Sequence, residues 1–443
     1  MRSLLTYISM KTNIVETFTL VSHEMLEVTK SIKIHHIQML LFSCMVAGYF
    51  YFGYVDFVGP FSLGVVSLLV LFLVSCLNYC IRSDRTISSS HIIISVVLIL
   101  MALWLYAVYD VPVIRLQKMF IVPIVLIFAV REGVKSIRQV NNALIIIAII
   151  VSISCIFAVL QAFDVDFFWD IRMLLGTAER GAVEYQLVNR IKAPGLALFS
   201  VPLSYQISAI FPFVIYLTYI STARRKMIIL GLCLVLGSLA SKSLSSILAI
   251  LVSYIVFMKL NHLLRPKRLL GFIIILMFLA IGFSYYNGLI SRIISPDHTV
   301  LSRIPFTLIG VKILLNAPLG ISGNELMDLM RYYLVDFRHI LGAKDIFEFG
   351  FHNCLLTFGV TYGWAVFIMY IWLYLYIFRL IYKPLKKSTI GSDDRYFYSG
   401  AIAYFCAYLI QSSTHSAGLM IGDPYDWIPL AVILTYKPSQ VST

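Results

Sequence analysis

Residues 143–163, ALIIIAIIVSISCIFAVLQAF, contain no Asp, Glu, Lys or Arg. The hydrocarbon core of a bilayer, about 30 Å thick, requires about 20 consecutive apolar residues in a helix, so this stretch can cross it once. Comparable charge-free runs recur along the chain, separated by charged or Pro/Gly clusters. The sequence therefore predicts an all-α fold, a polytopic membrane helix bundle with about 12 transmembrane helices. The predicted spans are residues 37–55, 59–80, 91–109, 113–130, 143–163, 196–220, 227–241, 243–259, 269–286, 354–378, 397–417 and 425–437.

Composition and charge agree with a membrane protein. Hydrophobic residues make up 60% of the 443 residues and charged residues only 13%, whereas a soluble domain carries about 25% charged residues. Lys and Arg fall on alternate connections between the predicted spans, and positively charged connections stay in the cytoplasm. This pattern predicts that both termini are cytoplasmic. The net charge of +13 then reflects topology rather than nucleic-acid binding, since no basic groove with interleaved aromatic residues is apparent.

The predicted organisation is a cytoplasmic N-terminal tail (1–36), a transmembrane domain (37–437) and a cytoplasmic C-terminal tail (438–443). Two predicted external loops, 164–195 and 287–353, are much longer than the other connections. Long loops without a domain of their own are commonly functional elements. Both loops retain aromatic and aliphatic residues, so we expect each to contain short helices lying in the outer membrane interface.

Two motifs in the second external loop carry groups suited to chemistry. Arg303 begins an apolar helical run that ends in Pro-Leu-Gly (318–320), which predicts a guanidinium held at a fixed position by an interfacial helix. A snorkelling Arg at the headgroup level is the alternative. His352 precedes the next predicted span and can accept a proton from a hydroxyl near neutral pH. A hydrogen-bonded His at the start of a helix capped by Asn353 is the alternative there.

Further basic residues are predicted on the outer side. Arg190 and Lys192, one residue apart and beside a Pro-Gly pair, can grip a phosphate or pyrophosphate, although anchors at the membrane interface would look the same. Lys242 lies at a tight external turn between the seventh and eighth spans. Arg115 and Lys118 lie just inside the outer end of the fourth span, three residues apart and hence on one helical face. All except Arg190, which is a catalytic candidate, are candidates for substrate binding.

Four short motifs follow one another between residues 190 and 380. A basic stretch with Pro-Gly precedes a helix, Ser-Lys-Ser starts an apolar helix, Ser-Arg leads into a helix ending in Pro-Leu-Gly, and His-Asn precedes a helix with Gly-x-x-x-Gly. Their order and shared external location resemble the bacterial O-antigen polymerase and O-antigen ligase superfamily of integral membrane glycosyltransferases. Two features depart from it. Lys242 stands where the family often has Arg, and the segment Gly323–His352 is compact compared with many ligases, which favours a polymerase.

The resemblance implies a polymerase that transfers a glycan from undecaprenyl pyrophosphate to a sugar hydroxyl of another lipid-linked repeat unit on the periplasmic side. Arg303 and Arg190 are then expected to stabilise the departing pyrophosphate, as fixed cations in a dry site do. His352 is the expected base for the acceptor hydroxyl, and Asn353 is expected to orient the substrate or the imidazole ring.

The resemblance also implies ligands and partners. Arg331 and Arg338 are expected to bind sugar or diphosphate, although a solvated loop face explains them equally well. No cofactor and no metal is expected, because arginines neutralise the phosphates and because His339 and His352 lack the spacing of a metal site. The expected partners are the undecaprenyl-pyrophosphate-linked glycan, membrane lipids, a chain-length regulator and a flippase, without nucleic acid. The expected location is the bacterial inner membrane, with the active site facing the periplasm.

Two other functions fit the same sequence. In an O-antigen ligase the acceptor is the core sugar of lipid A, and the motifs separate ligase from polymerase poorly. A transporter or flippase for lipid-linked sugars predicts charged residues along a path that spans the membrane. Here the charges concentrate on the outer side, and the spans show no division into two equal halves. The sequence therefore favours an enzyme with one externally open site.

Overall fold

The computed structural model describes most of the chain, and every structural statement below concerns these residues. They are residues 34–52, 56–58, 61–81, 88–134, 136–175, 189–190, 192–287, 303–321, 323–335, 353–415, 419 and 422–436.

The described chain is helical apart from one small hairpin, so the predicted all-α class is confirmed. Residues 34–47 form the first helix, which continues into the π-helical turn η1 (Gly48–Phe52), and β1 (Asp56–Val58) pairs with β2 (Phe61–Ser62). The elements that follow are α2 (Leu63–Ile81), α3 (Ser89–Tyr109), α4 (Val113–Leu116), η2 (Gln117–Ile121), α5 (Val122–Gly133), α6 (Ile137–Ala162), α7 (Asp166–Leu174), α9 (Ser200–Ile220), α10 (Arg224–Ala240), α11 (Leu244–Leu260), α12 (Pro266–Asn287), α15 (Arg303–Asn316), α16 (Gly323–Leu334), α18 (Cys354–Lys387), α19 (Asp393–Thr414) and α20 (Pro424–Thr435).

Each predicted span coincides with helical structure, but fewer helices qualify as membrane spans than predicted. Seven helices in the described chain are long and apolar enough to cross a bilayer. They are α2, α3, the continuous segment from α4 to α5, α6, α9, α12 and α18. The other segments are shorter or more polar; α20, with 12 residues, extends only about 18 Å, well short of a hydrocarbon core of about 30 Å. The protein is thus a multi-pass membrane protein with about seven clear spans.

Helix α9 lies at the centre of the bundle and α12 at its edge. Of the most apolar 18-residue stretch of α9, 78% is buried inside the protein, whereas only 11% of the corresponding stretch of α12 is buried. Polar side chains of α9 find partners on neighbouring helices: Ser208 Oγ accepts a hydrogen bond from Gln411 Nε2 at 2.7 Å, and Gln206 Nε2 donates to Phe50 O at 2.9 Å. Such interhelical hydrogen bonds hold helices together where the hydrophobic effect cannot.

The connections predicted to lie on one side of the membrane meet at one end of the bundle. At the end with the basic connections, Arg395 Nη2 donates to Leu260 O at 2.6 Å and Tyr216 OH donates to Asn141 Oδ1 at 2.8 Å. At the opposite end, which we call the outer end, Tyr109 OH donates to Leu319 O at 2.6 Å. The assembled bundle is therefore compatible with the alternating pattern of basic connections.

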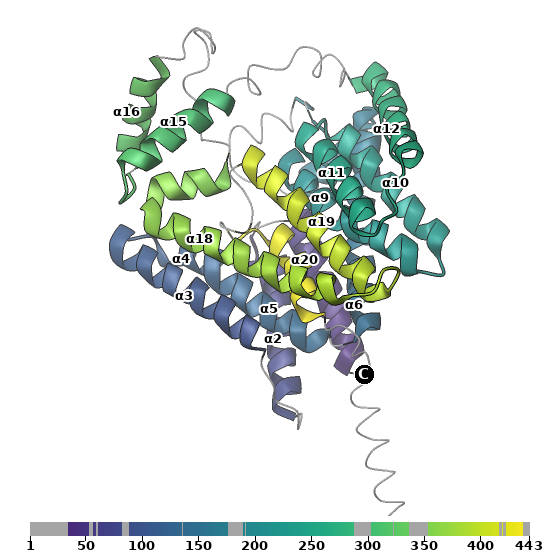
Figure 1. The fold of residues 1–443 in the computed structure, drawn as a ribbon, viewed down its shortest axis with the longest axis horizontal. Helices are drawn as coiled ribbons and strands as arrows, with labels where there is room; N and C mark the ends of the chain where they lie inside the picture. Colours follow the sequence, from purple (N-terminus) through teal and green to yellow (C-terminus); the bar gives the residue numbers. More distant parts are fainter. Residues whose placement is uncertain are drawn as a thin grey trace, which may run out of the picture.

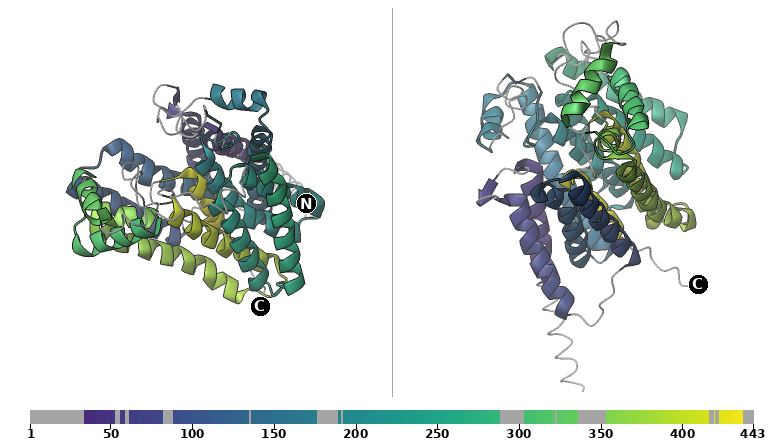
Figure 2. Two further views of the ribbon diagram at one scale, coloured as in Figure 1. Left: turned by 90° about the horizontal axis from the view of Figure 1, so that it is seen from above. Right: turned by 90° about the vertical axis from the view of Figure 1, so that its left-hand side faces the viewer.

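Short helices occupy both long loops, as expected. Helix α7 lies in the first loop, and α15 and α16 form a hairpin in the second, at the margin of the bundle (Figures 1 and 2). The hairpin has its own apolar cluster with the start of α18, which includes Phe306, Ile313, Met330 and Leu356. The second loop is thus folded onto the bundle where it is described.

Two of the sequence motifs contact each other at this junction. The turn at Pro318–Gly320 packs against a kink in α18, where Gly363 has φ +77 and ψ −177. Trp364 N donates to Pro318 O at 2.9 Å, and Ile321 N donates to Val360 O at 3.0 Å. The Pro-Leu-Gly and Gly-x-x-x-Gly motifs therefore serve close backbone packing between α15 and α18.

Candidate active site

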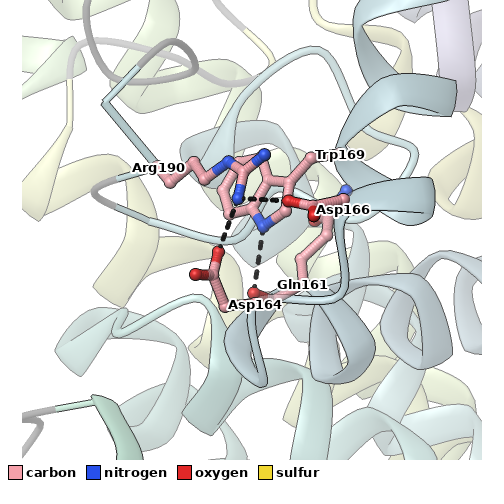
Figure 3. A network of polar contacts seen from close by, with 5 residues as sticks. All are labelled: Gln161, Asp164, Asp166, Trp169 and Arg190. Carbon is pink, nitrogen blue, oxygen red and sulfur yellow. Dashed lines mark hydrogen bonds and ion pairs between the residues drawn. The ribbon is translucent and has the colours of Figure 1, made fainter.

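The loop between α6 and α9 holds Arg190 in a polar network at the start of α7 (Figure 3). Its Nη1 atom lies 2.9 Å from Oδ1 of Asp164 and 2.7 Å from Oδ1 of Asp166. The guanidinium carbon lies 5.9 Å from the ring centre of Trp169, within cation–π range. Hydrogen bonds to Asp166 and Asp164 raise the pKa of Arg190. The two aspartates form an Asp-x-Asp pair whose negative charges exceed the single positive charge of Arg190.

Gln161 fixes the return of this loop to the bundle. Its backbone oxygen accepts a hydrogen bond from Trp169 Nε1 at 3.1 Å, and its side chain forms two hydrogen bonds with the backbone of Gly195, of 2.8 and 3.1 Å. Gly195 has φ +63, and a Cβ there would lie 2.1 Å from Ser154 O, so only glycine fits. The Pro-Gly pair is thus explained by packing, and the half-buried Lys192 lies just before it.

Arg172 on α7 is a buried cation that the sequence analysis did not single out. Its side chain is fully buried, and Nη2 donates to Leu198 O at 3.4 Å. Burial lowers the pKa of Arg172 to about 10, which leaves the guanidinium protonated at neutral pH. Tyr425 of α20 lies within electrostatic range of it. Buried arginines are rare in proteins, and one beside the outer end of a membrane bundle is a functional candidate.

The turn between α10 and α11 brings Lys242 near the end of α19. Lys242 is half-buried and has a left-handed φ of +54. Ser243 caps α11, its Oγ accepting a hydrogen bond from Ser246 N at 3.3 Å. Ser245 Oγ lies 3.2 Å from Nε2 of His415, the residue that follows α19. The Ser-Lys-Ser motif therefore lies beside a histidine that the sequence analysis also did not identify.

Neighbouring side chains at the outer end connect His415 with the buried Arg172. The ring of His415 lies 6.1 Å from the ring of Tyr205 on α9, and Asp426 of α20 lies within electrostatic range of Tyr205. Asp426 is buried, and its Oδ2 atom has no hydrogen-bond partner among the described residues. Tyr425, its neighbour, lies close to Arg172. We call Arg172, Tyr205, His415, Tyr425 and Asp426 the outer cluster.

The start of α18 lies against the outer cluster. Asn353 caps this helix, its Oδ1 accepting a hydrogen bond from Leu356 N at 2.9 Å. The next residue, Cys354, is fully buried and lies within electrostatic range of Tyr205. The side chain of Asn353 thus has a structural role, and its expected contact with substrate stays a prediction.

The remaining predicted residues of the second loop are not brought together by the described structure. Arg303 is the first residue of α15, but its side chain lies outside the described part, as do His352 and Arg338. Arg331 is exposed on α16 and pairs with Asp328 at 3.4 Å, one helical turn away. This geometry is that of a solvated helix face, and a role for Arg331 in binding sugar or diphosphate stays a prediction.

Arg115 and Lys118 are both exposed and lie three residues apart in the continuous helical segment from α4 to α5. Arg115 lies in α4, whereas Lys118 lies in the π-helical turn η2, where each residue turns less about the axis. Arg115 lies within electrostatic range of Tyr362, near the junction of α15 and α18. The backbone of Lys118 instead packs on Gly422, where a Cβ would lie 2.1 Å from Lys118 O.

Two features of the sequence indicate Arg172 and Asp426, which the sequence analysis did not single out. Trp169 and Arg172 are three residues apart in a segment predicted to be external and share the buried face of α7, although that spacing alone also fits an interface anchor. Asp426 is an acidic residue inside an apolar run, and ionisable groups at such positions are commonly functional. His415 gives no comparable local signal, because its neighbours come from other helices.

No group of three or more His, Cys, Asp or Glu side chains in the described part of the chain is arranged to hold a metal ion. No protein-family model matches the chain, and no curated protein matches it. What stands is a polytopic helical membrane protein with a buried cation, a histidine and a buried carboxyl at one end.

Proposed function

We propose that this protein is an O-antigen polymerase. It transfers a glycan from undecaprenyl pyrophosphate to a sugar hydroxyl of another lipid-linked repeat unit. The observation that carries the proposal is the buried, protonated Arg172 in the outer cluster, within one bundle end that also contains the motif residues Lys242 and Asn353. A fixed cation shielded from water is what a departing pyrophosphate requires. The order of the motifs along the chain supports the same reaction.

The proposed topology places this end in the periplasm of a bacterium. In this proposed topology the chain crosses the inner membrane about 12 times, because the first helix (34–52), α10, α11, α19 and α20 add five crossings to the seven clear spans. Both termini are cytoplasmic, because the connections rich in Lys and Arg then lie inside.

In the proposed reaction, the acceptor hydroxyl oxygen forms a bond with the anomeric carbon of the donor glycan. The bond from that carbon to the phosphate oxygen breaks, and undecaprenyl pyrophosphate leaves with the electron pair. Arg172 and Arg303 stabilise the negative charge that develops on the leaving group. The hydroxyl proton passes to a histidine, either His352 or His415. Arg190 is a weaker candidate cation, because two carboxylates already bind it.

A null strain complemented with variants tests this proposal. Gels of its surface polysaccharide are expected to show core plus a single repeat unit in the absence of the protein. Arg172→Met, Arg303→Ala and His352→Ala should fail to restore long chains at unchanged protein level. Arg225→Ala, which removes an exposed basic residue at the opposite end, should restore them fully.

Other results for the null strain contradict the proposal, and each result indicates a different function. Bare core with accumulated carrier-linked polymer in the null strain identifies a ligase. Failure of lipid-linked units to reach the outer leaflet identifies a transporter. Long chains retained in the null strain exclude both enzyme functions.

A further inference from the structure

A second site lies at the opposite end of the bundle from the outer cluster. A cavity of about 390 Å³ opens between α2, α3 and α5, which lie side by side in Figure 1. This volume is within the range of small-molecule sites, about 300–1,000 Å³. Most of its walls are apolar, formed by side chains such as Phe72, Val96, Ile124 and Phe128. Ile92 and Val96 at its rim are exposed, so the cavity opens towards the hydrocarbon around the bundle.

His91 is the unusual member of this wall. Its side chain is only 7% exposed, and neither ring nitrogen has a hydrogen-bond partner among the described residues. An imidazole buried in an apolar wall without partners costs free energy, which a ligand carrying hydrogen-bonding oxygens would recover. The histidine therefore indicates that the cavity receives a polar group as well as an apolar one.

Arg131 of α5 lines the same cavity and adds a positive charge within electrostatic range of His91. Glu132, the next residue, is buried but does not line the cavity wall. The described residues that line the cavity thus include a guanidinium and an imidazole and no carboxylate. A guanidinium binds phosphate with two parallel hydrogen bonds.

We propose that this cavity binds one anionic phospholipid, with the phosphate on Arg131 and His91 and an acyl chain along the walls of α2, α3 and α5. Three features favour a lipid over a soluble phosphate compound: the apolar walls, the rim open to hydrocarbon, and the location at the end with the basic connections. Basic pockets between transmembrane helices at the cytoplasmic side bind anionic headgroups in this way. The proposal goes beyond the reaction at the outer end and holds whatever that reaction is.

The test measures lipid binding to the delipidated full-length protein by native mass spectrometry. Phosphatidylglycerol and phosphatidylethanolamine with identical acyl chains serve as probes. The wild type should bind phosphatidylglycerol at least about tenfold more tightly than phosphatidylethanolamine. Both lipids carry the phosphate, but the ammonium of phosphatidylethanolamine would lie beside the like-charged Arg131 guanidinium. Glycerol 1-phosphate, which has the headgroup chemistry without the chains, should not compete at similar concentrations.

Three variants and one control locate the site. Arg131→Gln and His91→Leu should bring the ratio of the two affinities close to one. Ser95→Phe, which fills the cavity and keeps both basic groups, should weaken binding of both lipids about tenfold or more. Arg225→Gln removes an exposed basic residue of α10 outside the cavity and should change nothing.

Several outcomes overturn the inference. Equal binding of the two lipids by the wild type, or wild-type binding by Ser95→Phe, excludes an anionic lipid in this cavity. Competition by glycerol 1-phosphate at similar concentrations would assign the site to a soluble phosphate instead. Should Arg131→Gln fail to fold, Ser95→Phe and His91→Leu still decide the matter.

Discussion

The contact between α15 and α18 allows a quantitative test of the outer end of the fold. A Cβ at Gly363 would lie 2.5 Å from Pro318 O and 2.9 Å from Gly320 N. Gly363→Ala adds backbone strain of about 1–3 kcal/mol, because its φ and ψ are almost restricted to glycine. It is also expected to break the hydrogen bond from Trp364 N to Pro318 O, worth about 1 kcal/mol. We therefore expect the contact to be weakened by about 2 to 4 kcal/mol.

Substitutions at two other glycines allow the cost of backbone strain to be measured apart from the steric clash expected in Gly363→Ala. Gly391, between α18 and α19, has φ +85 with nothing within 4 Å of an added Cβ. Gly391→Ala therefore measures the cost of the conformation alone, about 1–2 kcal/mol. Gly271, within α12, has open space and no positive φ. Gly271→Ala should be neutral or stabilising by up to about 1 kcal/mol.

Limited trypsin digestion in detergent measures the detachment of α15. Cleavage after Lys312 reports on this helix, where the Lys312 ammonium lies 4.3 Å from the ring centre of Tyr333 on α16. Gly363→Ala should increase the cleavage rate by about 30-fold or more over the wild type, the rate change that corresponds to 2 kcal/mol or more. Thermal unfolding of the same samples reports on the whole bundle. Equal cleavage rates for Gly363→Ala and Gly391→Ala would refute the contact between the Pro318–Gly320 turn and α18.

Three further predictions concern the outer cluster and the first loop. Arg172→Met should lower polymerising activity about 100-fold or more at unchanged protein level. Because the pKa of Arg172 is lowered only to about 10, the guanidinium stays charged and the loss of activity should be constant between about pH 6 and 8. A loss of activity that depends on pH would contradict a purely cationic role. If His415 is the base, His415→Ala should lower polymerising activity strongly at unchanged protein level, and Ser245→Ala, which removes its hydroxyl partner, should change the pH–rate profile. Wild-type activity and an unchanged pH–rate profile in both variants would exclude this base. Asp166→Asn frees Arg190 from one carboxylate and should tighten binding of inorganic pyrophosphate in calorimetry, and weaker binding would exclude an anion contact there.

Apolar periodicity predicted where the helices lie, and seven of the 12 predicted spans are long and apolar enough on their own to cross a bilayer. Each charge-free run coincides with a helix over most of its described residues, because backbone groups must bond internally in lipid. Hydropathy measures the transfer of single side chains, so it cannot register the partners that a polar residue finds after folding. Gln206 and Ser208 make α9 less apolar, yet α9 is the central helix because those side chains bond to other helices. The short α20 shows the same limit, since 11 of its 12 residues are buried and the helix packs against α9 and α5.

Local motifs predicted the outer end of the bundle as the place of the candidate site but missed its most buried polar groups. Lys242 and Asn353 lie beside the outer cluster because each is adjacent to a helix end, which sequence spacing reveals. The two carboxylates on Arg190 depend on a turn with φ +51 that places residues 26 positions apart in contact. The pairing of Ser245 with His415 joins helices 170 positions apart. Such contacts require the folded arrangement and have no local pattern.

The fold places the two arginines of the first loop, Arg172 and Arg190, in different environments. Arg190 is partly exposed, and Asp164 and Asp166 already offset its charge, so a bound phosphate must displace or share those carboxylates. Arg172 is fully buried and protonated, so the cost of removing its charge from water is incurred during folding rather than during binding. An anion that reaches Arg172 meets a cation in a low-dielectric site, where the attraction is many times stronger than in water. Of the two, Arg172 is therefore better suited to stabilise charge that develops on a leaving pyrophosphate, and Arg190 to hold the loop that carries α7.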